Sequence, residues 1–451
     1  MANVTFQREL NVRHEADVFV AGGGPAGVAA AVAAAQQGKE VFLAEAQDCL
    51  GGMGTAGLVP AFMCFGDGVN FLSAGVGQEI LDRLVAAGGA GPNYRPENAH
   101  SGVAIRAEVL KRVYDEMLAD AGVDFTLRTT LIDVEADGDS VAAAVLAAKS
   151  GIFAVRAKVY IDCTGDGDLA AWAGAPFEKG DDDGRMMAGT LCNLWANVDF
   201  EAFREAGIGH ESALLEDAFK AGVFTLKDRH LPGMWELGEG IGGGNIGHTF
   251  DVDATDERSL TQALVWGRKL VSEYERYYKE YLKGFEKMVL VSTGSLLGVR
   301  ETRRITGDYA LCLEDFKNRA VFDDEIGRYS YPVDIHASDP SEESFEKFKQ
   351  ECTAFRYGPG ESYGIPYRTL VPAKLSNVLV AGRCVSSDRY IQSSIRVMPG
   401  CYITGQAAGV AAAIAIDADT DTRGVSVPEL QARLLKMGAC LPNATATSSR
   451  G

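Results

Sequence analysis

A glycine-rich turn between a predicted strand and a predicted helix constrains the fold of this chain more than any other feature. Residues 17–21 (DVFVA) favour a buried strand, and GGGPAG and an alanine-rich stretch follow at once. Gly22, Gly24 and Gly27 therefore form a GxGxxG pattern at the start of a helix. The first glycine permits the tight turn, the second lets the backbone approach a pyrophosphate, and the third allows close packing of the helix.

The residues after this turn complete a strand–helix–strand unit. Residues 39–44 (KEVFLA) have strand character, and Gly38 fits the end of the preceding helix. Glu45 follows this strand, 18 residues after Gly27, where a carboxylate can accept hydrogen bonds from an adenosine ribose. The order of strand, turn, helix, strand and acid predicts a dinucleotide site on a Rossmann-like layer, in preference to an isolated glycine turn.

A second glycine-rich segment helps to distinguish the two dinucleotides that share this fingerprint. Residues 50–57 (LGGMGTAG) follow Glu45 closely and offer another close approach of the backbone to a long ligand. A simple nicotinamide-dependent dehydrogenase has less need of such a segment. The pattern therefore favours FAD over NAD.

Strand-like runs far apart in the chain predict one sheet that is interrupted by a long insertion. Residues 158–163 (KVYIDC) lead into TGDGD, and residues 377–381 (NVLVA) lead into GRC. We expect the chain to leave the sheet near residue 170 and to return to it near residue 371. The prediction is an α/β fold: a Rossmann-like FAD-binding domain in residues 1–170 and 371–440, an inserted α+β substrate domain in residues 171–370, and a flexible tail in residues 441–451.

These segments resemble those of glutathione-reductase-like FAD-binding proteins. More narrowly, residues 296–309 (LLGVRETRRITGDY), 364–372 (GIPYRTLVP) and 394–413 (SIRVMPGCYITGQAAGVAAA) are similar to FAD-dependent oxidoreductases of the FAD_oxidored type. The resemblance implies FAD and redox chemistry, but this family acts on varied substrates. Members commonly carry a histidine shortly after the AGR strand, whereas this chain reads CVSSDRY there, so no role is transferred from that histidine.

The motifs and the resemblance together define the expected FAD-binding residues. They lie in the fingerprint turn, after the second strand, in the second glycine segment, after the third strand, after the AGR strand, and at the start of the late alanine-rich helix. The expected residues are Gly22, Gly24, Pro25, Ala26, Gly27, Glu45, Ala46, Gly51, Gly52, Met53, Thr55, Thr164, Gly165, Asp166, Gly382, Arg383, Pro399, Gly400, Tyr402 and Ile403.

The alanine-rich helix that begins near Pro399 also has a physical role that does not depend on the resemblance. Pro399 suits the first turn of a helix, because its missing N–H would be unpaired there. The positive end of the helix could then face the flavin N1 and C2 carbonyl and stabilise the reduced anion. An ordinary buried helix is the alternative.

Three residues are the catalytic candidates, each with a structural alternative. His248, in the glycine-rich segment GEGIGGGNIGHTFD, could donate or accept a proton near neutral pH. Arg396 precedes Pro399 by three residues and could hold a substrate carboxylate or compensate the charge of a reduced flavin. Tyr367 could act as an acid or base, or simply pack. In the run from Arg300 to Arg304, one arginine could clamp a substrate anion or the flavin while Glu301 pairs with another, or the run could be a solvated or domain-tying network of charges.

Composition excludes several other classes of protein. The chain has 43 Lys plus Arg against 62 Asp plus Glu, a net charge of −19, which disfavours nucleic-acid binding. Nine cysteines without a CxxC pair indicate reduced thiols and neither a disulfide framework nor a zinc site, and we expect no metal site. The first 20 residues contain charges throughout and no apolar signal segment, so we expect a cytoplasmic protein without a membrane partner.

The leading hypothesis is a FAD-dependent oxidoreductase that transfers a hydride between a small polar organic substrate and flavin N5. Two alternatives stay open: a flavoprotein subunit that passes electrons to a partner protein, and a non-catalytic dinucleotide-binding scaffold. The absence of an iron–sulfur type of cysteine run weakens the first of these, and the retention of all the glycine motifs weakens the second. A homo-oligomer is compatible with the sequence.

Overall fold

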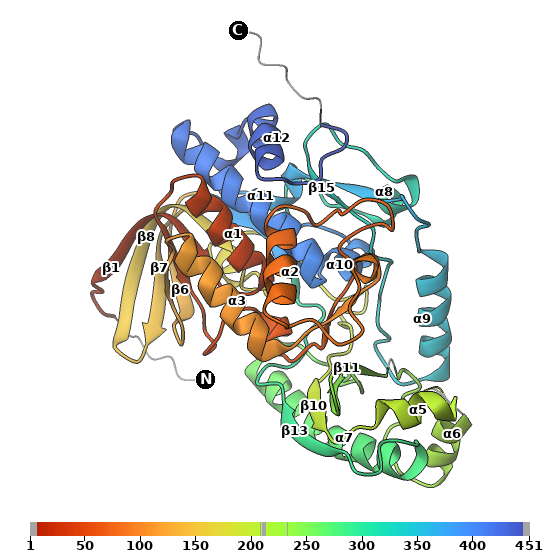
Figure 1. The fold of residues 1–451 in the computed structure, drawn as a ribbon. Coiled ribbons are helices and arrows are strands. Elements are labelled where there is room, and N and C mark those ends of the chain that lie inside the picture. Colours follow the sequence, from red (N-terminus) through yellow and green to blue (C-terminus); the bar gives the residue numbers. More distant parts are fainter. Residues whose placement is uncertain (1–6, 208, 210–212, 232, 445–451) are drawn as a thin grey trace.

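A mixed seven-stranded sheet forms the centre of the larger part of the molecule, which we call the main body (Figure 1). The structure is a computed structural model that describes residues 7–207, 209, 213–231 and 233–444. The sheet has the order β5-β2-β1-β8-β7-β6, and β17 also pairs with β8. Its strands are β1 (Val12–Ala21), β2 (Val41–Ala44), β5 (Asp124–Thr126), β6 (Thr130–Asp137), β7 (Ser140–Ala148), β8 (Gly151–Asp162) and β17 (Val378–Val380).

The long strand β8 holds together segments from both ends of the chain. Its first half pairs antiparallel with β7, and Tyr160, Ile161 and Asp162 pair in parallel with β17. Along its length β8 also pairs in parallel with β1, which in turn pairs in parallel with β2. The α/β architecture and the return of the chain to the sheet at β17 therefore confirm the predicted Rossmann-like fold.

The glycine turn folds as its sequence predicts. Gly22 has a φ of +93°, in the region that favours glycine, and α1 (Pro25–Gln36) begins with proline in its first turn. A Cβ added at Gly27 would overlap the carbonyl oxygen of Gly22. The third glycine is therefore required for close packing of the helix against the turn that precedes it.

The late helix α11 (Met398–Asp417) lies directly against α1. A Cβ added at Gly405 would overlap the carbonyl oxygen of Ala26, and one added at Gly409 would overlap that of Ala30. The 20-residue α11 is long and apolar enough to cross a membrane, but its most apolar window is 94% buried inside the protein. Its apolar character is therefore accounted for by the core that it shares with α1.

A second body, residues 193–293, lies below the main body in Figure 1, and we call it the small body. Its antiparallel sheet has the order β11-β12-β10-β13, made of β10 (Asn193–Ala196), β11 (Met234–Gly238), β12 (Ile241–Gly244) and β13 (Val289–Thr293). Helices α5 (Phe200–Ala206), α6 (Ala213–Lys220) and α7 (Glu257–Tyr281) accompany it. Trp195, Tyr274, Tyr278 and Phe285 belong to a buried core of its own.

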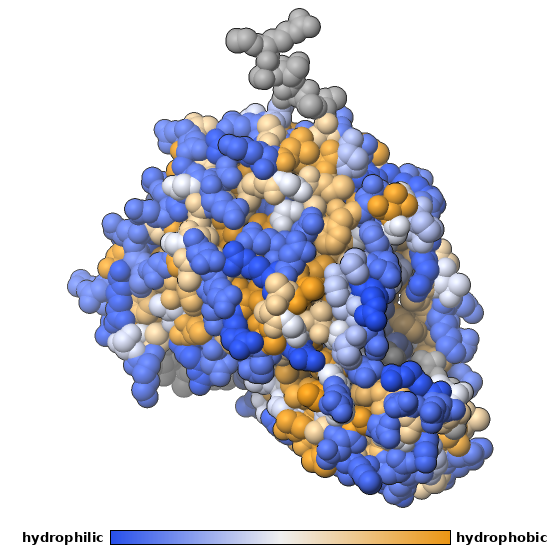
Figure 2. All heavy atoms as spheres, viewed as in Figure 1, coloured by the Kyte–Doolittle hydropathy of each residue, from blue (hydrophilic) through white to orange (hydrophobic). Residues whose placement is uncertain are grey.

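The chain between the small body and β17 returns to the main body. Leu311, Tyr329 and Tyr363 are buried in the main core, and β15 (Glu325–Tyr329) pairs with β16 (Tyr363–Pro366). The helix α9 (Glu342–Ala354) lies at the side of the molecule, next to a hollow on the face that Figure 2 shows. The remaining elements are β3 (Ala61–Phe62), β4 (Val103–Ala104), β9 (Phe177–Lys179), β14 (Arg303–Ile305), α2 (Val76–Ala86), α3 (Ala107–Asp120), α4 (Asp168–Trp172), α8 (Leu313–Asn318), α10 (Arg389–Ile395) and α12 (Val427–Lys436).

Candidate active site

A cavity of about 430 Å³ lies at the carboxyl ends of β1, β2, β8 and β17. This is the edge of an open α/β sheet where ligands bind. Gly22, Glu45 and Thr164 line the cavity together with Gly382 and Val397 from the far end of the chain. The two distant halves of the predicted cofactor site therefore share one ligand-sized space.

The fingerprint turn presents bare backbone to this cavity. Gly24 lines it, and a Cβ added at Gly24 would meet no atom within 4 Å. Gly24 is also the N-cap of α1, so the unpaired N–H groups and the positive end of that helix lie beside the open space. The turn therefore has the room and the donors that a diphosphate requires.

The carboxylate of Glu45 fixes the turn and still borders the cavity. Its Oε2 accepts a hydrogen bond from the backbone N–H of Gly23 at 2.6 Å, and its Oε1 accepts one from Gln47 at 2.7 Å. Burial raises the pKa of Glu45, although these two N–H groups oppose that effect. Because each carboxylate oxygen can accept a further bond, Glu45 fits the expected ribose-binding role.

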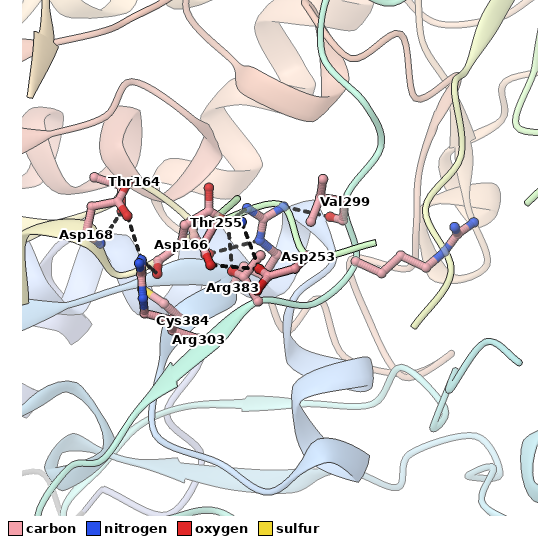
Figure 3. Close-up of polar contacts among 12 residues, drawn as sticks. Thr164, Asp166, Asp168, Asp253, Thr255, Val299, Arg303, Arg383 and Cys384 are labelled. Carbon is pink, nitrogen blue, oxygen red and sulfur yellow. Dashed lines mark hydrogen bonds and ion pairs between the residues drawn. The ribbon is translucent and has the colours of Figure 1, made fainter. Parts of the chain in front are cut away.

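Arg383 joins three segments of the cavity wall (Figure 3). Its Nη2 donates to Asp166 Oδ1 at 2.6 Å, its Nε to the carbonyl of Gly165 at 2.9 Å, and its Nη1 to the carbonyl of Val299 at 2.6 Å. Thr302 Oγ1 donates to the same oxygen of Asp166 at 2.7 Å. Arg383 therefore positions the loop after β8 and the segment before β14 around the cavity.

The start of α11 reaches the cavity, but through different residues from those expected. Val397 is the N-cap of the helix, and it lines the cavity together with Met398 and Cys401. Tyr402 instead faces Tyr114, with the two hydroxyl oxygens 2.5 Å apart. A Cβ added at Gly400 would overlap the carbonyl oxygen of Ile395, so this glycine serves close packing.

The expected cofactor residues thus divide into two groups. Those in the turn, after β2, after β8 and after β17 mostly line the cavity, as the sequence predicts. The others are not among the residues that line the cavity, so their contact with the cofactor stays a prediction: Gly27, Gly51, Thr55, Pro399, Gly400, Tyr402 and Ile403. Thr55 donates its hydroxyl to the carbonyl of Leu50 at 2.5 Å.

Arg396 is the one catalytic candidate that lines the cavity. Its Nη2 lies 3.2 Å from the carbonyl oxygen and 3.3 Å from Oδ2 of Asp334. Its buried Nε has no hydrogen-bond partner among the described residues. This arginine therefore retains donor capacity next to the entrance of α11.

Arg300 is a second buried cation that lines the cavity, and this residue is 6% exposed. Its Nη1 donates to the carbonyl of Ala188 at 2.7 Å and to Thr190 Oγ1 at 2.9 Å, and its Nη2 lies 3.5 Å from Asn245 Oδ1. Burial lowers the pKa of Arg300 to about 10, and Arg396 adds to that effect. Within the described ranges, no carboxylate forms an ion pair with it at 4.0 Å or less.

The rest of this charge run behaves differently. Arg303 donates to Asp168 Oδ1 at 2.6 Å, and Arg304 pairs with Glu301. The structural alternative therefore applies to Arg303 and Arg304, and the clamp alternative stays a prediction for Arg300. Arg300 faces the cavity, whereas Arg303 and Arg304 tie structural elements together.

The other two catalytic candidates lie away from the cavity. Tyr367 is buried, its hydroxyl donates to the carbonyl of Thr422 at 2.6 Å, and burial raises its pKa. This placement favours the packing alternative and removes the reason to expect Tyr367 to act on a substrate. His248 is also buried behind the wall, where its Nε2 lies 2.9 Å from Nδ1 of His336.

The residues that face the cavity in place of His248 come from a segment that sequence reasoning missed. Tyr331, Asp334 and His336 all line it. The segment RYSYPVDIH shows no recognisable motif, and its only signal is three polar side chains within six positions. The segment follows β15, whose pairing with the distant strand β16 the sequence does not reveal.

The chain was compared with protein families, curated proteins and solved structures. The family model described as FAD dependent oxidoreductase matches residues 17–434. No curated protein gives a significant match. Among solved structures, a geranylgeranyl bacteriochlorophyll reductase-like protein from Thermoplasma acidophilum is 14% identical, with a TM-score of 0.48, covering 94% of this chain and 83% of that one. The p-nitrophenol 4-monooxygenase PnpA from Pseudomonas putida DLL-E4 is also 14% identical, with a TM-score of 0.47, covering 94% of this chain and 84% of that one.

Proposed function

The chain belongs to the FAD-dependent oxidoreductase family, with FAD as its cofactor, and from this premise we propose that it transfers a hydride between a small carboxylate-bearing substrate and flavin N5. FAD supplies the two-electron chemistry when it is bound. The residues of the chain bind and orient the two reactants and exclude water. The family match supports the cofactor and the reaction class, and the cavity residues support the class of substrate.

The observation that carries the proposal is the buried, unpaired charge of Arg300. Removing a guanidinium from water is costly unless an anion compensates it. Asp334, the carboxylate on the same wall, lies within ion-pair distance of Arg396 and not of Arg300. A substrate carboxylate would supply the missing negative charge.

The surroundings of Arg300 also suit a bound anion. Ala188 and Thr190 offer neutral oxygen acceptors, which orient the guanidinium without neutralising it. A guanidinium held in one orientation can bind a carboxylate through two parallel hydrogen bonds at little entropic cost. Leu260, Leu264 and Leu297 line the cavity as well and supply apolar surface for the rest of a small substrate.

The test is anaerobic mixing of the FAD-loaded protein with matched pairs of compounds. Each pair contains a 2-hydroxy or 2-amino acid and its methyl ester, and bleaching of the flavin is followed in time. The acid is expected to reduce the flavin about 100-fold faster than its ester, in keeping with loss of about 2.7 kcal/mol from a charge-assisted contact.

Equal rates for acid and ester would overturn the assignment of a carboxylate substrate. The Arg300→Gln variant separates substrate binding from cofactor binding. It is expected to keep its FAD and to lose the preference for the acid. Loss of FAD from this folded variant would instead assign Arg300 to the cofactor.

A further inference from the structure

Three of the six histidines of the chain lie together beside the cavity, and one of them, His336, lines it. His230 follows α6, His248 follows β12 and His336 follows β15, so three separate loops bring them together. One ring nitrogen of each lies within 4.8 Å of the corresponding nitrogens of the other two. His248 and His336 are buried, and His230 is half-buried.

Carboxylates stand behind two of these rings. Asp228 Oδ2 lies 3.0 Å from Nδ1 of His248, and Asp334 Oδ1 lies 3.5 Å from Nε2 of His336. Negative charge at these positions favours the ring proton on the nitrogen that faces the carboxylate. An outer carboxylate behind an imidazole is the arrangement that orients histidine ligands in metal sites.

The inner nitrogens of His248 and His336 then face each other with lone pairs. These atoms, Nε2 of His248 and Nδ1 of His336, are 2.9 Å apart. Two lone pairs at that distance repel unless a proton or a metal cation lies between the rings.

A proton between the rings would sit on His248 Nε2 or on His336 Nδ1, and the outer nitrogen of that neutral ring would then face a carboxylate without a proton. A metal ion between the rings instead lets both outer nitrogens keep their protons toward Asp228 and Asp334. Neutral imidazole is the form that binds a metal ion.

We propose that His230, His248 and His336 bind one divalent transition-metal ion of the Zn²⁺ class, with Asp228 and Asp334 as outer partners of the ligands. Three imidazole nitrogens suit Zn²⁺, Co²⁺, Ni²⁺ or Cu²⁺, whereas Mg²⁺ and Ca²⁺ prefer oxygen ligands. Three protein ligands leave a fourth position for water or a small molecule. The proposal rests on the three histidines and not on Arg300, so it does not depend on the substrate proposed above.

The site is also connected to the cavity. Asp334 lies beside His336 on one side and 3.3 Å from Nη2 of Arg396 on the other. His336 itself lines the cavity. Removal of a divalent charge at the histidines is therefore expected to change the absorbance or circular dichroism of the bound flavin.

The test measures metal in the full-length, FAD-loaded protein purified without a histidine tag. Elemental analysis by mass spectrometry is expected to give about one equivalent of metal per flavin, removable by a chelator. Co²⁺ added to the stripped protein is expected to produce the visible d–d bands of a tetrahedral site. His248→Ala should lose the metal and the Co²⁺ bands and keep the FAD.

His100→Ala is the matched control, because His100 is a half-buried histidine outside the cluster. It should bind metal like the unchanged protein. If His248→Ala does not fold, His230→Gln is used in its place, because His230 is the less buried ligand. Far-UV circular dichroism and flavin content show whether each variant is folded. Metal content that survives both cluster variants, or stripped protein that gives no Co²⁺ bands, would overturn the proposal.

Discussion

The two walls of the cavity are built in different ways. The cofactor wall uses backbone and glycine, and Gly22, Gly24 and Glu45 lie within one strand–turn–helix–strand unit. Another part of the lining, which we call the charged wall, uses charged side chains, and its Arg300 and Arg396 come from segments far apart in the chain. Local backbone geometry can be inferred from a short motif, whereas a pair of charges depends on how loops from separate elements meet. Variants of the two walls should therefore fail in different ways.

The largest effect is expected at Gly27, where the cofactor wall has no spare room. Gly27→Ala places a methyl group against the carbonyl oxygen of Gly22, and α1 must shift to accommodate it. We expect the free energy of unfolding to fall by about 3 kcal/mol, as for an overpacked core. Chemical denaturation checks this, with Gly24→Ala as the control, because a Cβ at that position meets no atom within 4 Å. Equal stability of the two variants would contradict the packing role of Gly27.

Gly24→Val should separate cofactor binding from folding. Gly24 has a φ of −67° and a ψ of −175°, which valine can adopt, and its added Cβ points into open space. The folded protein should therefore tolerate the change, but the side chain would fill the approach of the diphosphate. We expect at least a tenfold loss of FAD affinity, or about 1.4 kcal/mol, measured by flavin titration of the apoprotein. A variant that retains its flavin normally would place the diphosphate elsewhere.

On the charged wall, Arg300→Gln should slow the reaction and stabilise the fold. Reduction of the flavin by a carboxylate substrate is expected to slow about 100-fold, with unchanged FAD content. Removing a buried cation that has no counter-ion should raise the free energy of unfolding by about 1 kcal/mol in the absence of substrate. Stopped-flow reduction and denaturation measure the two effects. Arg300→Lys keeps the positive charge but lacks the planar guanidinium that binds a carboxylate through two hydrogen bonds. Its rate of flavin reduction should lie between those of the unchanged protein and Arg300→Gln.

Arg396→Ala gives the informative contrast, because Arg396 already has a partner. The variant leaves Asp334 buried without its arginine. The free energy of unfolding should therefore fall, whereas Arg300→Gln should raise it. Flavin reduction is expected to slow about tenfold, more than the FAD content falls, because Asp334 already compensates part of this charge. Unchanged anaerobic reduction kinetics would remove Arg396 from the substrate wall.

The same contrast explains how far the sequence could be interpreted. The turn from Gly22 to Gly27, Glu45 and the helix beginning near Pro399 follow from local patterns, and the structure contains all of them. The position of His336 does not follow from any local pattern, because its loop follows β15, whose pairing with the distant strand β16 the sequence does not reveal. His248 was singled out for its glycine-rich surroundings, yet those glycines serve β12, where bulkier side chains would collide with Met234 and Leu237.

The smallest effect is expected at Tyr367, for which the sequence left acid–base action and packing open and which the structure places in the core. Tyr367→Phe removes only the hydrogen bond to the carbonyl of Thr422, and that carbonyl is left without this donor. We expect a loss of about 1 kcal/mol in the free energy of unfolding and no change in the rate of flavin reduction. Tyr331→Phe is the matched variant on the cavity wall, where the same loss of a hydroxyl should change the reduction rate. A hydroxyl in the core can change the rate of flavin reduction only by disturbing the fold. Slower reduction in a folded Tyr367→Phe variant than in Tyr331→Phe would therefore reverse the assignment of these two tyrosines.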